Sequence, residues 1–157
     1  FREQRLFCYQ WLMYVDAGVA AITGDPVGFA REQWETWSPP GWYAEGDFER
    51  AAASFRNPDW VAITLHAYRS RFLASEPIDP AYTDLRRQVA ATEHLVVPTL
   101  MLHGGDDRCD PPATSEGLDG HFDSYRRVVI DGVGHFPHRE DPDSVVAAVL
   151  PHLDEHE

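Results

Sequence analysis

The chain lacks lysine altogether: its 13 basic residues are all arginines, and 26 acidic residues outnumber them. The formal net charge is therefore −13. Nucleic acids and anionic membrane surfaces bind proteins through clustered basic side chains, so this balance argues against both kinds of partner. We interpret the missing lysine itself as a bias of composition, because charge balance bears on solubility and association and does not determine a fold.

Cysteine is scarce, and long apolar runs are missing. Cys8 and Cys109 lie far apart in the sequence and form no disulfide framework, so we expect a reduced, cytoplasmic location. No apolar run approaches the length of a membrane span, and the first residues do not show a signal-peptide pattern. The histidines and cysteines show no recognised zinc spacing, so we expect neither a metal nor a cofactor.

The hydrophobic pattern changes near residue 90. Before it, apolar residues recur at helical spacing, and proline or a capping aspartate marks several helix starts. This pattern predicts helices at about 3–22, 26–37, 47–55, 58–72 and 81–91. After it, a continuous apolar run predicts a buried strand at 97–103. We expect a second buried strand at 126–131 and helices at 112–122 and 143–153. Alternating buried strands and helices are typical of an α/β domain. We interpret residues 1–90 as a helical region and residues 91–157 as the end of such a domain.

An ionisable residue follows each predicted strand. Asp107 lies in the turn after the first strand, and His135 lies in the turn after the second. Parallel strands bring these turns to one edge of the sheet, where open α/β sheets bind their ligands. There the carboxylate of Asp107 would orient the imidazole of His135, which would act as a general base. Asp106 is the alternative acid.

No nucleophile accompanies this pair. An acid followed later by a histidine forms the second and third parts of the nucleophile–acid–histidine order of α/β-hydrolases. The chain contains no Gly-x-Ser-x-Gly, no aspartate in an equivalent turn, and no serine framed by glycines. It also begins with Phe1 and not with methionine. We therefore expect a fragment, a processed chain or an incomplete sequence, whose missing N-terminal core would carry the nucleophile.

Two segments carry a family resemblance. Residues 102–107 read Leu-His-Gly-Gly-Asp-Asp, and residues 131–136 read Asp-Gly-Val-Gly-His-Phe, followed by Glu-Asp-Pro. Together they resemble the acid strand and the histidine loop of the α/β-hydrolase superfamily, and within it the epoxide-hydrolase branch with a helical lid. The resemblance implies an α/β-hydrolase fold in which a helical lid, residues 1–90, precedes the last two parallel strands and the C-terminal helices of the core, residues 91–157.

Two tyrosines narrow the resemblance. Epoxide hydrolases use one lid tyrosine in a Tyr-Gln pair and another in a later Tyr-Arg pair, and Tyr9 and Tyr68 stand in similar pairs here. Two phenols can polarise an epoxide oxygen and stabilise the alkoxide that forms as the ring opens. The alternative is that both are core aromatics whose hydroxyls hydrogen-bond locally. The candidate substrate-binding residues are Gln10, His66 and Phe136.

The resemblance implies hydrolysis of a small, apolar to moderately polar epoxide. A serine esterase or lactonase, or a dehalogenase of the same fold, stays open because the nucleophile would decide among them. A non-catalytic fragment or binding remnant is the alternative of another class. A sheet without its first strands leaves an open edge. We therefore expect a companion N-terminal segment or chain, or self-association.

Overall fold

The computed structural model describes residues 5–73 and 75–156, which form two compact units. The first unit contains the described residues of Phe1–Glu35 and Tyr43–Asp84. The second contains Thr36–Trp42 and the described residues of Leu85–Glu157. A short segment that interrupts the first unit in sequence thus packs with the second.

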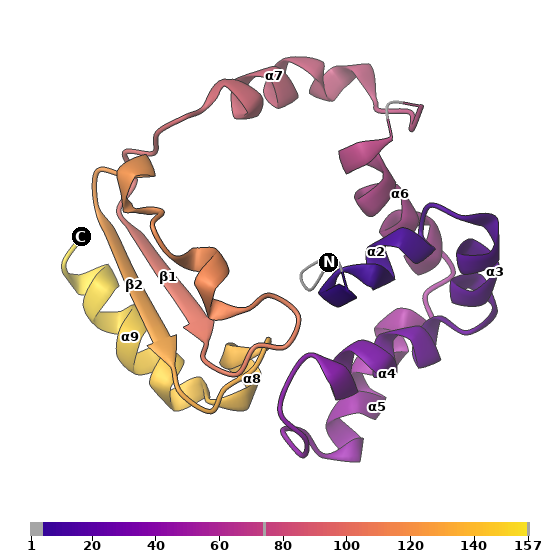
Figure 1. Cartoon of the computed structure of the whole chain (residues 1–157), viewed down its shortest axis with the longest axis horizontal. Coiled ribbons are helices and arrows are strands. Elements are labelled where there is room, and N and C mark those ends of the chain that lie inside the picture. The colour runs from indigo at the N-terminus through magenta and orange to yellow at the C-terminus, as the bar shows by residue number, and fades with distance from the viewer. Residues whose placement is uncertain (1–4, 74, 157) are drawn as a thin grey trace. The chain divides into compact units, whose positions relative to one another are not determined.

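The first unit consists mainly of helices (Figure 1). These are α2 (Cys8–Leu12), α3 (Asp16–Gly24), α4 (Pro26–Thr36), α5 (Glu45–Phe55) and α6 (Trp60–Phe72). The single helix predicted at 3–22 is wrong, because Val15 adopts an extended conformation with φ −116° and ψ 143° and separates α2 from α3. Gly18 then lies against the backbone of Leu12, where a Cβ atom would overlap it.

The core of the first unit centres on Phe48, which is fully buried in α5. The ring of Trp34 from α4 meets it edge to face, with 5.3 Å between ring centroids. Arg31 places its guanidinium 3.9 Å from the centre of the Phe48 ring and makes two hydrogen bonds to the carboxylate of Glu45, at 2.9 and 2.7 Å. These contacts join α4 to α5.

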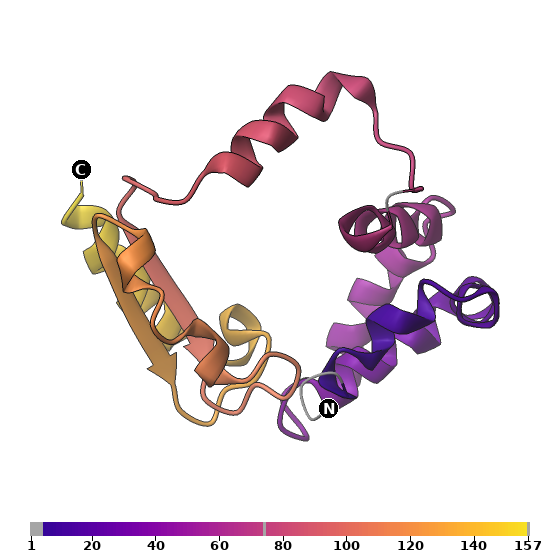
Figure 2. The same ribbon diagram turned by 45° about the horizontal axis from the view of Figure 1, so that its top comes forward.

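The second unit is built on two parallel strands, as the sequence predicts. β1 (Thr99–Gly104) pairs with β2 (Tyr125–Ile130), with Gly104 opposite Ile130 at their C-terminal ends. The short α8 (Pro137–Glu140) and the longer α9 (Pro142–Asp154) follow β2, and both pack against β1. Figure 2 shows α9 lying along the strand pair.

The helix predicted at 112–122 is wrong. The structure has two short 3₁₀ helices there, Pro112–Ser115 and Asp119–His121. Gly117 lies between them with a φ of +69°, a left-handed conformation that ends the first turn. Ser115 is buried and accepts a hydrogen bond from Nε of Arg127 at 2.8 Å. This segment is therefore held by a hydrogen bond to β2 and does not form one continuous helix.

α7 (Thr83–Ala91) follows a 3₁₀ turn at Pro80–Tyr82 and buries none of its residues. Its apolar side chains Leu85 and Val89 are exposed. Among the residues that the structure describes, no helix has both the length and the apolar character needed to cross a membrane.

Candidate active site

The site of the second unit lies where β1 and β2 end. Because Gly104 and Ile130 are register partners, the turns that follow them meet directly. The backbone N–H of Gly105 donates to the carbonyl of Ile130, and that of Asp106 donates to the carbonyl of Val133, both at 2.8 Å. The acid turn and the histidine turn are therefore one hydrogen-bonded structure.

Asp107 and His135 form a hydrogen bond across these turns. Oδ2 of Asp107 lies 2.8 Å from Nδ1 of His135, and the Asp107 side chain is only 6% exposed, against 30% for His135. An ionised carboxylate can only accept, so Nδ1 carries the proton and Nε2 is left as the basic nitrogen. Asp106, the alternative acid, is exposed. Asp107 and His135, which the sequence analysis pairs, are thus within hydrogen-bonding distance in the structure.

Backbone N–H groups and a buried histidine hold the turn that carries Asp107. Its Oδ1 accepts hydrogen bonds from the backbone N–H groups of Cys109 and Asp110, both at 2.8 Å. The buried His103 donates from Nε2 to the carbonyl of Asp110 at 2.6 Å and lies 3.6 Å from Oδ2 of Asp107. His103 therefore closes the acid turn.

Glycines allow the turns to approach each other. Gly104 faces the carbonyls of Val133 and Gly134, and Gly134 in turn faces Ser38, so a Cβ atom at either glycine would overlap its neighbour. Gly132 has a φ of +74°, which residues with side chains rarely adopt. The glycines around His135 thus allow both the close packing of the two turns and the backbone conformation of the histidine turn.

Ser38 and Glu140 contact the histidine turn and were missed in the sequence. The hydroxyl of the fully buried Ser38 donates to Oε1 of Glu140 at 2.7 Å and accepts from the backbone N–H of His135 at 3.0 Å. Glu140 also accepts from the backbone N–H groups of Gly134 and Phe136, at 2.6 and 2.9 Å. Ser38 is 97 residues from His135, so no local pattern could reveal it.

Two aromatic side chains, Trp37 and Phe136, contact the ring of His135. Phe136 stacks with both Trp37 and Trp42, with ring-centroid distances of 6.2 and 5.0 Å. The ring of Trp37 also meets the imidazole of His135 edge to face at 4.9 Å. Phe136, a predicted substrate contact, is thus part of an apolar aromatic surface beside the histidine.

The first unit contains the two predicted tyrosines. Tyr9 and Tyr68 come from α2 and α6 and meet edge to face, with 5.8 Å between ring centroids. Gln10 donates from Nε2 to the hydroxyl of Tyr9 at 3.2 Å. His66 is exposed and pairs through Nδ1 with Glu76 at 3.1 Å. The structure therefore brings Tyr9, Gln10 and Tyr68 together, while His66 interacts with Glu76.

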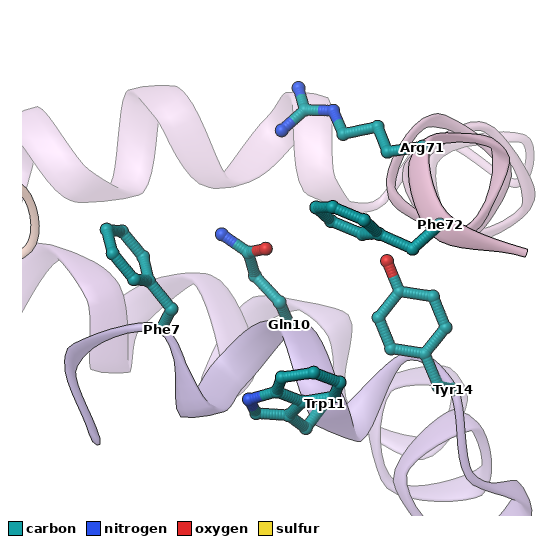
Figure 3. Close-up of a pocket in the computed structure, with 6 residues that line it drawn as sticks. All are labelled: Phe7, Gln10, Trp11, Tyr14, Arg71 and Phe72. Carbon is teal, nitrogen blue, oxygen red and sulfur yellow. The ribbon is translucent and has the colours of Figure 1, made fainter. Parts of the chain in front are cut away.

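A pocket of about 380 Å³ opens in the first unit (Figure 3), and its lining residues are Phe7, Gln10, Trp11, Tyr14, Arg71 and Phe72. Tyr14 donates its hydroxyl to the backbone carbonyl of Tyr68 at 2.7 Å. Burial raises the pKa of Tyr14, against the opposing charges of Arg71 and Arg69. Gln10 connects this pocket to the tyrosine pair.

Within the described part of the chain, no group of three or more histidine, cysteine, aspartate or glutamate side chains is arranged to hold a metal ion.

Comparison with known proteins places this chain in a family. The chain matches the family model of the alpha/beta hydrolase family over residues 8–149. A crystal structure described as a "putative epoxide hydrolase" from Klebsiella pneumoniae subsp. pneumoniae is 30% identical, with a TM-score of 0.87. The match covers 96% of this chain and 50% of that one, so the chain spans about half the length of this relative. A search of curated proteins gave no match. The chain belongs to the alpha/beta hydrolase family.

Proposed function

We propose that this chain contributes the acid–base pair and the substrate-polarising groups of an epoxide-hydrolase-like enzyme. The observation that carries the proposal is the 2.8 Å hydrogen bond between Asp107 and His135 at the C-terminal ends of two parallel strands. The likeness to the Klebsiella protein supports the epoxide as substrate class. In this proposal the nucleophile, an aspartate, comes from outside these 157 residues.

In the first step, the nucleophilic carboxylate attacks one carbon of the epoxide and the ring C–O bond breaks. The ring oxygen becomes an alkoxide, which the hydroxyls of Tyr9 and Tyr68 stabilise by donating hydrogen bonds. The edge-to-face contact of their rings keeps the two phenols close together, which supports a joint role. The product of this step is an ester between substrate and enzyme.

In the second step, Nε2 of His135 takes a proton from water, and the water oxygen attacks the ester carbonyl. Asp107 stabilises the imidazolium that forms, through the hydrogen bond to Nδ1. The ester bond breaks, and the imidazolium and the new carboxylic acid return two protons to the two substrate oxygens. A diol leaves, and the carboxylate and the neutral histidine are regenerated.

The aromatic surface formed by Trp37, Trp42 and Phe136 supports a small substrate with an apolar substituent, because such a surface excludes water beside the base. Neither Cys8 nor Cys109 is in a disulfide in the described structure, which is compatible with the cytoplasmic location that we include in the proposal.

The first test is the intact mass of the protein purified from its source, with N-terminal sequencing. We expect additional residues or a companion chain that carries an aspartate on a strand-to-helix turn. A serine at that turn would replace the epoxide hydrolase with an esterase or lactonase. A mass that corresponds to these 157 residues alone would overturn the catalytic proposal in favour of a binding remnant.

The second test is a single turnover of an epoxide in ¹⁸O-labelled water by the protein completed in this way. Attack by an enzyme carboxylate puts an unlabelled enzyme oxygen into the diol of the first turnover. Label in the diol of the first turnover would instead mean direct attack by water and would exclude the ester intermediate. Turnover of a haloalkane without any epoxide activity would identify a dehalogenase.

A further inference from the structure

We propose that Thr36–Trp42 is a positioning strap for the proposed catalytic pair, in which Ser38 holds the backbone of His135 and Glu140 anchors Ser38. The inference rests on the proposed role of His135 as the base and assigns the groups that aim its ring. We call this segment the strap.

The strap is bonded to both turns of the site. The backbone N–H of Arg108, the residue after Asp107, donates to the carbonyl of Trp37 at 3.0 Å. The backbone N–H of His135 donates to the hydroxyl of Ser38, also at 3.0 Å. Two adjacent strap residues therefore contact the acid turn and the histidine turn separately, and they fix the distance between the two turns.

Ser38 and Glu140 together hold three consecutive backbone N–H groups. The N–H groups of Gly134 and Phe136 donate to Glu140, and that of His135, between them, donates to Ser38. The direction of a side chain follows from its backbone, so this arrangement sets where the imidazole points. Because a buried polar group without a partner is costly, the network strongly favours this single conformation.

The Ser38 hydroxyl is committed to this structural role. It is 0% exposed, its proton is directed at Glu140, and its oxygen accepts from His135. A nucleophilic serine needs an exposed oxygen and a basic nitrogen as its proton acceptor, and Ser38 has neither. Its place between the carboxylate and the histidine turn is that of a positioning residue.

The strap also contacts the imidazole ring directly. The ring of Trp37 packs on that of His135 at a centroid distance of 4.9 Å and an angle of 75°. Gly134 has no space for a Cβ atom because Ser38 occupies it. Backbone hydrogen bonds, close packing and an aromatic contact therefore all act on one side chain. Catalytic geometry tolerates only about 0.5 Å of displacement, so loss of any of them should disturb the base.

The test compares Ser38→Ala with the control Ser115→Ala. Ser115 is also buried in the second unit, at 1% exposure, and its hydroxyl donates to the carbonyl of Pro112 at 3.0 Å and accepts from Arg127 at 2.8 Å. Each variant thus removes one buried hydroxyl with two hydrogen bonds. Only Ser38 touches the histidine turn.

The readout is the Nδ1–H proton of His135 in NMR spectra of ¹⁵N-histidine-labelled protein, assigned by its loss in His135→Gln. We expect Ser38→Ala to broaden or shift this signal and to speed its exchange with water, and Ser115→Ala to leave it unchanged. With a substrate in hand, kcat should fall by about 10–100-fold in Ser38→Ala with little change in KM.

Glu140→Gln is a second variant that keeps the side-chain volume and leaves Ser38 in place. Its amide group cannot accept from all the donors that face Glu140, so we expect the same change at His135. If Ser38→Ala does not fold, Glu140→Gln decides. A wild-type His135 signal in a folded Ser38→Ala or Glu140→Gln protein would overturn the proposal. The NMR signal of His135 is measured without turnover. It therefore tests the strap independently of the epoxide proposal, which the turnover experiment tests.

Discussion

Asp107 divides its two carboxylate oxygens between His135 and the main chain. Oδ2 faces the imidazole, and Oδ1 holds the N–H groups of Cys109 and Asp110. One side chain thus builds its own turn and orients the base, so the two roles can be separated by a substitution that changes only one oxygen.

Asp107→Asn is that substitution. An asparagine oxygen can keep the two backbone hydrogen bonds, while its amide group would face Nδ1 and favour the wrong histidine tautomer. We expect folding to be kept and kcat of the completed enzyme to fall by about 10³–10⁴-fold. Circular dichroism and steady-state kinetics measure the two effects. Asp106→Asn is the control, and a larger loss there would mean that the acid is Asp106.

Tyr9→Phe and Tyr68→Phe test the phenols. Each change removes one hydroxyl and keeps the ring contact, so we expect kcat/KM for an epoxide to fall by about 10²-fold in each variant. Tyr82→Phe, which changes an exposed ring, should behave as wild type. Full activity in the double variant Tyr9→Phe, Tyr68→Phe would show that both rings serve packing only.

Gly134→Ala should destabilise the second unit. The new Cβ atom would overlap Ser38, so the strap or the histidine turn has to move. We expect a loss of about 1–3 kcal/mol in the free energy of unfolding, measured by urea denaturation. Gly120→Ala has open space around its Cβ position and should change stability by less than about 0.5 kcal/mol. Equal effects in both variants would contradict close packing at Gly134.

Asp141 should make the stability of α9 depend on pH. It caps this helix by accepting hydrogen bonds from the hydroxyl and the N–H of Ser144, which lowers the pKa of Asp141 below its ordinary value. Its contribution to stability is therefore complete above that value and is lost as the pH falls through the lowered, folded-state pKa.

Urea midpoints measured at decreasing pH should show this loss in the wild type and a smaller loss in Asp141→Asn. Asp143→Asn is the matched control in the same first turn, since Asp143 is exposed. A steeper acid dependence in Asp141→Asn than in the wild type would contradict the sign.

The isolated 157-residue chain should self-associate. In the described structure β1 pairs with β2 alone, and the preceding Val96 and Val97 are 71% and 65% exposed. An open strand edge beside exposed apolar side chains is a typical site of association. Sedimentation velocity should show larger species as concentration rises, and Val97→Glu should reduce them. A compact monomer at all concentrations would refute this expectation.

Local patterns were enough to predict the strands and the Asp107–His135 pair. The first strand contains a continuous apolar run and the second ends in Val-Val-Ile. Each catalytic candidate lies in the turn that follows one strand, so parallel pairing brings Asp107 and His135 together. The same reasoning failed where conformation depends on tertiary packing contacts that the periodicity of apolar residues does not encode. The break at Val15 accompanies packing of Gly18 on Leu12, and the segment after Pro112 is held by Arg127 of β2.

The partners of the histidine turn were beyond sequence reasoning for a similar reason. Ser38 stands in a Trp-Ser-Pro-Pro-Gly-Trp stretch that looks like an ordinary loop between helices. Its contact with His135 spans 97 residues, and periodicity carries no information over that separation. Glu140 lies close to the histidine, but its acceptor role becomes visible only once the turn has folded around it.

The strap limits how this fold can be recombined. Because Thr36–Trp42 belongs to the second unit but lies between α4 and α5, the chain passes between the units at Glu35, at Tyr43 and at Asp84. A chimera that takes residues before Asp84 from a relative would also take the relative's strap. That strap would then have to pack on the histidine turn of this chain. Exchange of the first-unit helices between relatives should succeed only with junctions at all three places, so that Ser38 stays with the histidine turn that it contacts.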